Sequence, residues 1–118
     1  MKTIILIEDD KAIRDVFFLA LDPGKYEVST FETGSVILES RLAVPDLFML
    51  DKNIAGTDGL ALCRFIKASE VYNHTPVIIL SASANIREVA MAAGADDAIS
   101  KPFTLKALRD IIALHISK

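Results

Sequence analysis

Short apolar runs recur along the chain, and segments with helical spacing separate them. The runs expected to form strands are 3–7, 27–31, 46–50, 76–80 and 97–100. Several are almost continuously apolar, as in Val77-Ile78-Ile79-Leu80, and strands buried on both faces of a parallel sheet have this composition. The run 27–31 alternates more, which favours a position nearer the edge of the sheet.

Between these runs, apolar residues return every three or four positions, as Ile13, Phe17 and Leu21 do. This spacing predicts helices with one buried face. The expected end residues are Thr33 or Ser35 at the start of the second helix, Gly94 after the fourth, and Thr104 before the last. Strict alternation of strand and helix predicts an α/β fold, a doubly wound five-stranded parallel sheet with right-handed crossovers.

Composition narrows the class of protein further. The 118 residues fit a single domain over 1–118, and 52% apolar residues are enough for a packed core. The lone Cys63 suits a reducing compartment. The net charge is −3, with no basic run for nucleic acid and no apolar stretch of signal-peptide or membrane-span length. We therefore expect a cytoplasmic domain that binds neither nucleic acid nor membrane directly.

Polar residues fall at the ends of four of the five predicted strands. They are Glu8 and Asp9 after the first, Asp51 after the third, Ser81 after the fourth and Lys101 after the fifth. In a parallel sheet these ends share one edge, where open α/β sheets bind ligands. Converging carboxylates repel each other, so some must take up a proton or a cation must join them. If a cation binds, the all-oxygen ligand set selects Mg²⁺. With Lys101 and Ser81 to hold phosphoryl oxygens, a carboxylate nucleophile would form an acyl phosphate.

Each of these groups also has a simpler explanation when taken alone. The run Glu8-Asp9-Asp10 suits the cap and acidic first turn of a helix, and this describes Asp10. Asp51 suits a turn, Ser81 a hydroxyl that satisfies a strand end, and Lys101 a solvated surface. Their matching positions at the strand ends favour the site over these separate explanations.

Five segments, in order, resemble the receiver domains of two-component signalling, including the chemotaxis receivers. They are Ile5-Leu6-Ile7-Glu8-Asp9-Asp10, Pro45-Asp46-Leu47-Phe48-Met49-Leu50-Asp51, Asp58-Gly59, Pro76-Val77-Ile78-Ile79-Leu80-Ser81-Ala82, and Gly94-Ala95-Asp96-Asp97 with Lys101-Pro102-Phe103. The resemblance covers the whole chain. It implies a flavodoxin-like (βα)5 fold with strand order 2-1-3-4-5 and a cis bond before Pro102.

The resemblance also implies a role for each site residue. Asp51 would accept the phosphoryl group from a histidine kinase or a histidine phosphotransfer protein. Mg²⁺ would bind Asp9 and Asp51 directly, Glu8 through water and Asn53 through its backbone carbonyl. Ser81 would bond the phosphoryl group, Lys101 would pair with it, and Asn53 and Ser83 would tune its hydrolysis. The domain would catalyse only its own phosphorylation and dephosphorylation, and a weak homodimer would use the face of the fourth helix, fifth strand and fifth helix.

Two positions depart from the family pattern. Ala55 replaces the usual proline four residues after the acceptor, which predicts a freer loop. Ala98 replaces the usual aromatic residue three positions before Lys101, which predicts a weaker or different structural response on the face of the fourth helix, fifth strand and fifth helix. The remaining candidates, His74 and His115, are expected at the surface, and Cys63 is expected in the core.

Two alternatives remain open at this point. A magnesium-dependent phosphatase that forms an aspartyl phosphate usually carries a second acid two residues after its nucleophile, where this chain has Asn53. A receiver-like interaction module that takes no phosphate is favoured by Ala55 and Ala98, but every group that the chemistry needs is present.

Overall fold

The structure is a computed structural model that describes residues 1–54 and 56–116. Its strands in the described residues are β1 (Lys2–Ile7), β2 (Tyr26–Phe31), β3 (Leu47–Asp51), β4 (Asn53–Ile54), β5 (Thr57–Asp58), β6 (Val77–Ser81) and β7 (Asp97–Ser100). Its helices are α1 (Lys11–Ala20), α2 (Ser35–Leu38), α3 (Gly59–Ala68), α4 (Ile86–Ala92) and α5 (Leu105–Ile116). The main elements alternate, as predicted.

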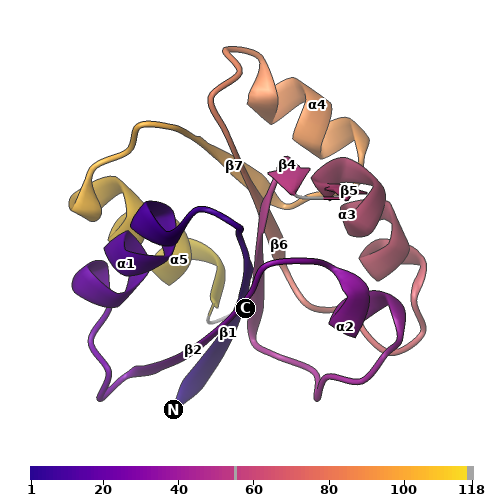
Figure 1. Cartoon of the computed structure of the whole chain (residues 1–118), viewed down its shortest axis with the longest axis horizontal. Coiled ribbons are helices and arrows are strands. Elements are labelled where there is room, and N and C mark those ends of the chain that lie inside the picture. The colour runs from indigo at the N-terminus through magenta and orange to yellow at the C-terminus, as the bar shows by residue number, and fades with distance from the viewer. Residues whose placement is uncertain (55, 117–118) are drawn as a thin grey trace.

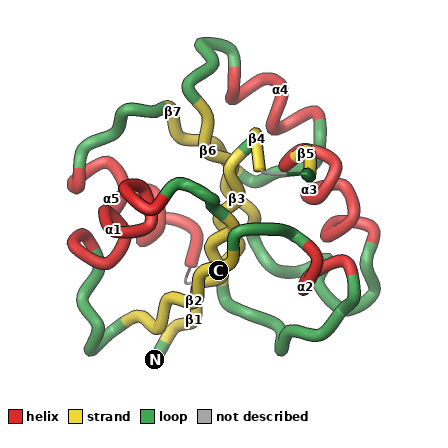
Figure 2. Tube along the Cα trace, viewed as in Figure 1, coloured by secondary structure: helices red, strands yellow, loops and turns green. Residues whose placement is uncertain are grey.

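A five-stranded parallel sheet in the order β2-β1-β3-β6-β7 forms the centre of the molecule. Counting only these strands, the order is the predicted 2-1-3-4-5, with the half-buried β2 at an edge. Figure 1 shows α1 and α5 on one face of the sheet and α2, α3 and α4 on the other. Figure 2 shows the strands as the layer between these two groups of helices. The fold is therefore the flavodoxin-like one that the resemblance implied.

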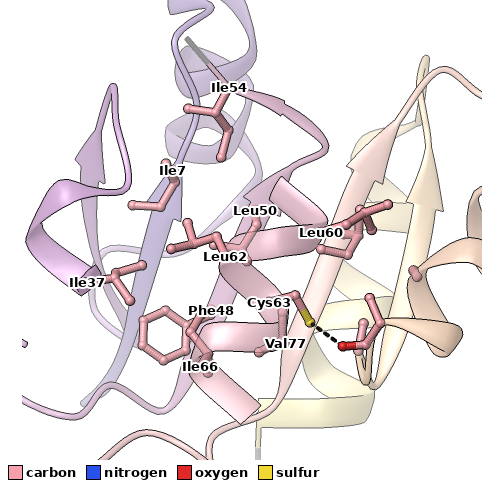
Figure 3. Close-up of a cluster of buried hydrophobic side chains, with 14 of the residues drawn as sticks. Ile7, Ile37, Phe48, Leu50, Ile54, Leu60, Leu62, Cys63, Ile66 and Val77 are labelled. Carbon is pink, nitrogen blue, oxygen red and sulfur yellow. Dashed lines mark hydrogen bonds between the residues drawn. The ribbon is translucent and has the colours of Figure 1, made fainter. Parts of the chain in front are cut away.

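Each face of the sheet has its own apolar cluster. Ile4, Leu6 and Phe17 belong to the cluster beneath α1 and α5, whereas Phe48 and Cys63 belong to the cluster beneath α2, α3 and α4 (Figure 3). Every residue of β3 and β6 is buried, which explains why these strands are almost continuously apolar.

Strands β3 and β6 each lie one residue further along the chain than predicted. The Lys52 N–H donates to the Leu80 carbonyl at 2.8 Å, and the Lys101 N–H donates to the Ser81 carbonyl at 2.8 Å. These bonds extend the parallel ladder through Asp51 and Ser81, which are consequently the last residues of their strands. A polar side chain is tolerated there because the end of the strand opens onto the edge of the sheet.

Most of the predicted helix ends are confirmed. Asp10 caps α1 by accepting from the Ala12 N–H, Thr104 accepts from the Ala107 N–H, and Gly94 follows α4 with φ +94°. The prediction for α2 was wrong, because its cap residue is Gly34 and no side chain caps it. The hydroxyls of the two predicted residues, Thr33 and Ser35, bond to each other at 3.1 Å instead.

Strands β4 and β5 form a small antiparallel pair that the sequence did not predict. Gly56 lies in its turn with φ +72°, a conformation that suits glycine. The freer loop predicted from Ala55 falls on a residue outside those described. The bond between Lys101 and Pro102 is cis, as the resemblance implied.

The surface prediction for His115 was wrong. His115 is buried, and its Nε2 lies 2.7 Å from Oδ2 of Asp97, which supplies a charged partner inside the fold. His74 is exposed and Cys63 is buried, both as predicted. The Cys63 thiol donates to the Ala93 carbonyl at 3.6 Å (Figure 3), and burial raises its pKa to about 11. Among the described residues, no helix has both the length and the apolar character to cross a membrane.

Candidate functional site

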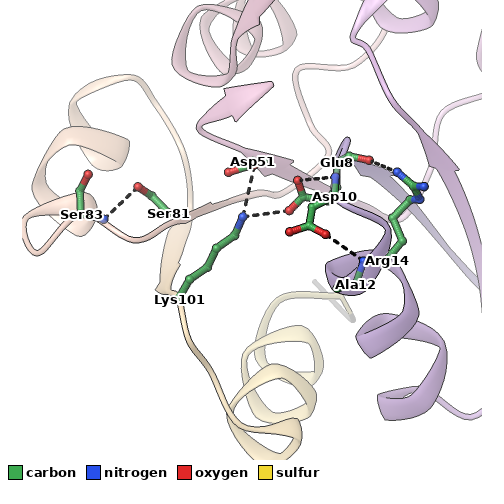
Figure 4. Close-up of polar contacts among 8 residues, drawn as sticks. All are labelled: Glu8, Asp10, Ala12, Arg14, Asp51, Ser81, Ser83 and Lys101. Carbon is green, nitrogen blue, oxygen red and sulfur yellow. Dashed lines mark hydrogen bonds and ion pairs between the residues drawn. The ribbon is translucent and has the colours of Figure 1, made fainter. Parts of the chain in front are cut away.

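The predicted polar residues lie at the carboxyl edge of the sheet, and Lys101 contacts two of them. Its ammonium lies 2.9 Å from Oε1 of Glu8 and 3.2 Å from Oδ2 of Asp51. Glu8 and Lys101 are 93 residues apart in the sequence. Figure 4 shows the Lys101 side chain extending from the strand end to both carboxylates. The parallel topology has therefore brought the first, third and fifth main strands to one site.

Three acidic side chains form a compact set of oxygen ligands. Glu8, Asp9 and Asp51 can each place one carboxylate oxygen so that all three lie within 4.8 Å of one another. Glu8 is fully buried and Asp51 is 6% exposed, whereas Asp9 is exposed. The set is open to solvent on the side of Asp9, and its hard oxygens fit Mg²⁺, which retains several waters when bound to proteins.

Burial and charge perturb the titration of this cluster. Burial raises the pKa of the Glu8 carboxyl to about 7, and the neighbouring Asp51 adds to the rise against the opposing effect of Lys101. Burial also acts to lower the pKa of Lys101, but its contacts with Glu8 and Asp51 outweigh burial and raise it. Lys101 is consequently a fixed positive charge beside the Asp51 carboxylate.

The loop that carries the first two acids is held by its own neighbours. The Glu8 N–H donates to the Phe31 carbonyl at 3.0 Å, which continues the pairing of β1 with β2. On the other side, the Arg14 guanidinium donates to the Glu8 carbonyl at 2.9 Å. The sequence analysis did not identify Arg14, because no pattern of residue types reveals a bond to a main-chain acceptor.

The segment after Asp51 approaches α3 very closely. The Gly59 N–H donates to the Lys52 carbonyl at 2.8 Å. A Cβ at Gly59 would lie 2.0 Å from the Asp51 carbonyl oxygen. Asn53, whose carbonyl was predicted to bind the metal, begins β4 and is exposed. The tight packing of Gly59 therefore fixes the backbone from which both Asp51 and Asn53 project.

Ser81 and Ser83 lie at the rim of the site. Ser81 is 2% exposed, and its hydroxyl accepts from the Ser83 N–H at 3.1 Å. Figure 4 shows the two serines together, on the far side of Lys101 from Glu8. The Ser81 hydroxyl thus satisfies a backbone group, which was the simpler of its two predicted roles, while Ser83 is half-buried.

Ala98 lies in the strand that leads to Lys101. It is half-buried and packs against the apolar cluster beneath α3 and α4. Its neighbour Asp97 binds His115 of α5 and lies 2.6 Å from the guanidinium of Arg87 on α4. Burial opposes ionisation of Asp97, but these contacts and the Ala98 N–H lower its pKa below the usual value. Asp97 of β7 therefore links α4 and α5 through its bonds to Arg87 and His115, next to the small side chain of Ala98.

Comparison with known proteins shows the family of this chain. The model of the response regulator receiver domain matches residues 4–113. The transcriptional regulatory protein CseB of Streptomyces coelicolor is 40% identical over 103 residues, which cover 85% of this chain and 43% of CseB. The chain spans less than half the length of the curated relatives that it matches first.

Two solved structures illustrate the similarity in three dimensions. The receiver domain of the sensor histidine kinase PA1611 from Pseudomonas aeruginosa has a TM-score of 0.85 at 28% identity, covering 99% of this chain and 98% of that one. That structure holds a magnesium ion in its active site cleft. The chemotaxis response regulator CheY4 of Vibrio cholerae, with a TM-score of 0.86 at 22% identity over 97% of this chain and 98% of its own, shares the fold. The chain therefore belongs to the response regulator receiver domains, whose general role in two-component signalling is to accept a phosphoryl group.

Proposed function

We propose that Asp51 is the residue that accepts the phosphoryl group, and that Glu8, Asp9, Asp51 and the backbone carbonyl of Asn53 hold Mg²⁺ for this reaction. The observation that carries the proposal is the position of Lys101, whose ammonium lies within 3.2 Å of both Glu8 and Asp51. A fixed cation beside a nucleophilic carboxylate is suited to hold a phosphoryl oxygen during transfer.

In the proposed reaction, an oxygen of the Asp51 carboxylate attacks the phosphorus of a phosphohistidine. The phosphorus–nitrogen bond breaks, the histidine nitrogen leaves with the bonding electrons, and Asp51 becomes an acyl phosphate. Lys101 then exchanges part of its contact with Asp51 for a phosphoryl oxygen. When bound, Mg²⁺ supplies further positive charge to phosphoryl oxygens. Ser81 would donate its hydroxyl proton to a phosphoryl oxygen, a donor that its present bond from the Ser83 N–H does not use.

The remaining features of the proposal follow from this chemistry. The phosphodonor is a histidine kinase or a histidine phosphotransfer protein, and the reaction takes place in the cytoplasm. The chain catalyses only its own phosphorylation and the later hydrolysis, with Asn53 and Ser83 beside the site to tune it. We also propose that residues 1–118 act as one receiver domain without binding nucleic acid themselves, and that a weak homodimer forms through α4, β7 and α5.

The phosphatase alternative is less consistent with the site. Its second acid would stand two residues after Asp51, where the exposed Asn53 has an amide that does not ionise and cannot act as a general acid. Release of inorganic phosphate from a phosphate ester at many turnovers would favour it. The interaction-module alternative requires that Asp51 takes no phosphoryl group, and the next experiment tests this directly.

Intact mass after incubation with acetyl phosphate and Mg²⁺ tests the acceptor. We expect an adduct of one phosphoryl group on the wild type, none on Asp51→Asn, and none on the wild type in EDTA. Asp10→Asn is the matched control, because Asp10 is an exposed acid beside the site and asparagine caps a helix equally well. It should be phosphorylated like the wild type. An adduct on Asp51→Asn would overturn the assignment, and no adduct on any protein would favour the interaction module.

A further inference from the structure

Arg14 holds the main chain of the metal-binding loop from outside the site. It lies in the first half of α1, and its side chain is 18% exposed. One guanidinium nitrogen, Nη1, donates to the Glu8 carbonyl at 2.9 Å and lies 3.8 Å from a carboxylate oxygen of Glu32, beyond the end of β2. Arg14 therefore connects α1, the end of β1 and the segment after β2.

Figure 4 shows that Arg14 and Lys101 contact Glu8 from opposite sides. Lys101 binds the side chain of Glu8, whereas Arg14 binds its backbone carbonyl. The next residue, Asp9, is exposed and makes no hydrogen bond or ion pair with another described residue. The position of its carboxylate is thus set by the backbone that Arg14 holds.

If the loop from Glu8 to Asp10 were not held in place, its carboxylates would bind a metal ion more weakly. Within the Glu8–Asp10 turn itself, the bond from the Asp10 N–H to Oε2 of Glu8 is long, at 3.4 Å. Mg²⁺ demands near-ideal octahedral geometry. Groups that orient metal ligands without touching the metal commonly change its affinity by 10- to 100-fold.

We propose that Arg14 is a positioning residue for divalent cations: by holding the Glu8 carbonyl it orients the carboxylates of Glu8 and Asp9 toward the metal. The proposal rests on the proposed function, because it assumes that these acids bind Mg²⁺. Arginine suits the role because its guanidinium is planar, always charged and pre-organised, so less side-chain freedom is lost when it donates to the Glu8 carbonyl than with the flexible ammonium of lysine.

The direction in which Mg²⁺ affinity changes when Arg14 is replaced distinguishes a positioning role from simple charge repulsion. Arg14 is a positive charge near a site for a positive ion. If the charge alone mattered, its removal would strengthen Mg²⁺ binding, because repulsion would be relieved. If Arg14 orients the ligands, its removal weakens binding. Arg14→Met keeps most of the apolar stem and removes both the charge and the donors.

Isothermal titration of the full chain with MgCl₂, without a phosphodonor, makes the test. We expect Arg14→Met to bind Mg²⁺ about tenfold more weakly than the wild type. In acetyl phosphate assays, its half-saturating Mg²⁺ concentration should rise by the same factor, while its rate at saturating Mg²⁺ stays near that of the wild type. Arg41→Met is the matched control, since Arg41 pairs with Glu39 on the surface, and it should bind like the wild type.

Circular dichroism and urea unfolding check that the variants fold. Arg14→Lys, which keeps the charge and the stem, carries the test should Arg14→Met not fold, and we expect a smaller loss of affinity in it. Unchanged or tighter Mg²⁺ binding in the folded variant would overturn the role of Arg14 but leave the proposed metal ligands in place. Absence of Mg²⁺ binding by the wild type would overturn the proposed metal set, and this inference with it.

Discussion

Replacing Gly59 by alanine should displace the backbone at the phosphoryl acceptor. A Cβ at this position would lie 2.0 Å from the Asp51 carbonyl oxygen and 2.9 Å from the Lys52 Cα, whereas real Cβ contacts essentially never fall below 3.0 Å. The chain must therefore open by at least about 1 Å, the difference between 3.0 and 2.0 Å. Both neighbouring atoms belong to the main chain, so rotation of a side chain cannot relieve the clash.

Two magnitudes follow from this displacement. Forcing an extra methyl group into a packed position commonly costs about 1–3 kcal/mol of folding free energy. A misplacement of about 1 Å at a reacting group can lower a rate by about a hundredfold. Because Asp51 itself must shift or turn when its carbonyl moves, we expect G59A to lose both stability and phosphorylation rate.

The two losses are measured by urea unfolding and by the initial rate of phosphorylation from acetyl phosphate, followed by intact mass. G24A is the matched control, because the three atoms nearest to a Cβ there belong to the exposed Asp22 side chain, the first at 3.2 Å, and a side chain can rotate away. It should behave like the wild type in both assays. If G59A phosphorylates and unfolds like the wild type, the tight contact between α3 and the acceptor segment is not what fixes Asp51.

Three further predictions concern titration and switching. In metal-free buffer, the free energy of unfolding should fall by up to about 3 kcal/mol as pH rises from 4.5 to about 7. Folding raises the pKa of Glu8, so over this range the folded state keeps a proton that the unfolded state loses. If the free energy of unfolding changes with pH equally in the wild type and in Glu8→Gln between about pH 5 and 8, the prediction is contradicted. Asp97 has a lowered pKa when folded, so its contribution to stability is present above its unfolded pKa of about 3.9 and is lost as pH falls below it. Asp97→Asn should therefore lower the urea stability at neutral pH by about 2 kcal/mol, since its bonds to His115 and Arg87 lose their charge, and an unchanged midpoint would show that these bonds contribute little. Finally, amide spectra with and without beryllofluoride should change around the acceptor but little around Ala98 and α5, and large shifts there would refute a weakened switch.

The sequence was sufficient to predict those site residues whose positions depend only on where the strands end. Asp51 and Lys101 could be placed together because buried apolar runs locate parallel strands, and parallel strands share one carboxyl edge. The sequence could not identify the bond from Arg14 to a carbonyl, because every residue offers the same acceptor. It placed Gly59 in a family motif, but only coordinates show how near α3 approaches Asp51.

The error at His115 has the same origin. Its place on α5 fitted a surface position, and nothing in the spacing indicated that Asp97, 18 residues earlier, would face it in the core. The sequence predicted that the Ser81 hydroxyl could satisfy a backbone group, but it did not identify that group as the Ser83 N–H. The spacing of apolar residues thus predicts which helices and strands are buried, whereas contacts between polar residues far apart in the sequence can be identified only from the folded structure.

The last helix packs against the first, and this has a consequence for how the protein is made. Arg109 of α5 donates to the Ala20 carbonyl at the end of α1, and the rings of Phe17 and Phe103 meet edge to face at 6.4 Å. During synthesis, Glu8 has no Lys101 to bind until 93 further residues have been added. At ordinary rates of translation this takes about 5 to 20 s. Until α5 has left the exit tunnel, the face of the sheet that α5 shares with α1 stays partly uncovered, so its apolar residues are accessible to a chaperone before the acceptor site is complete.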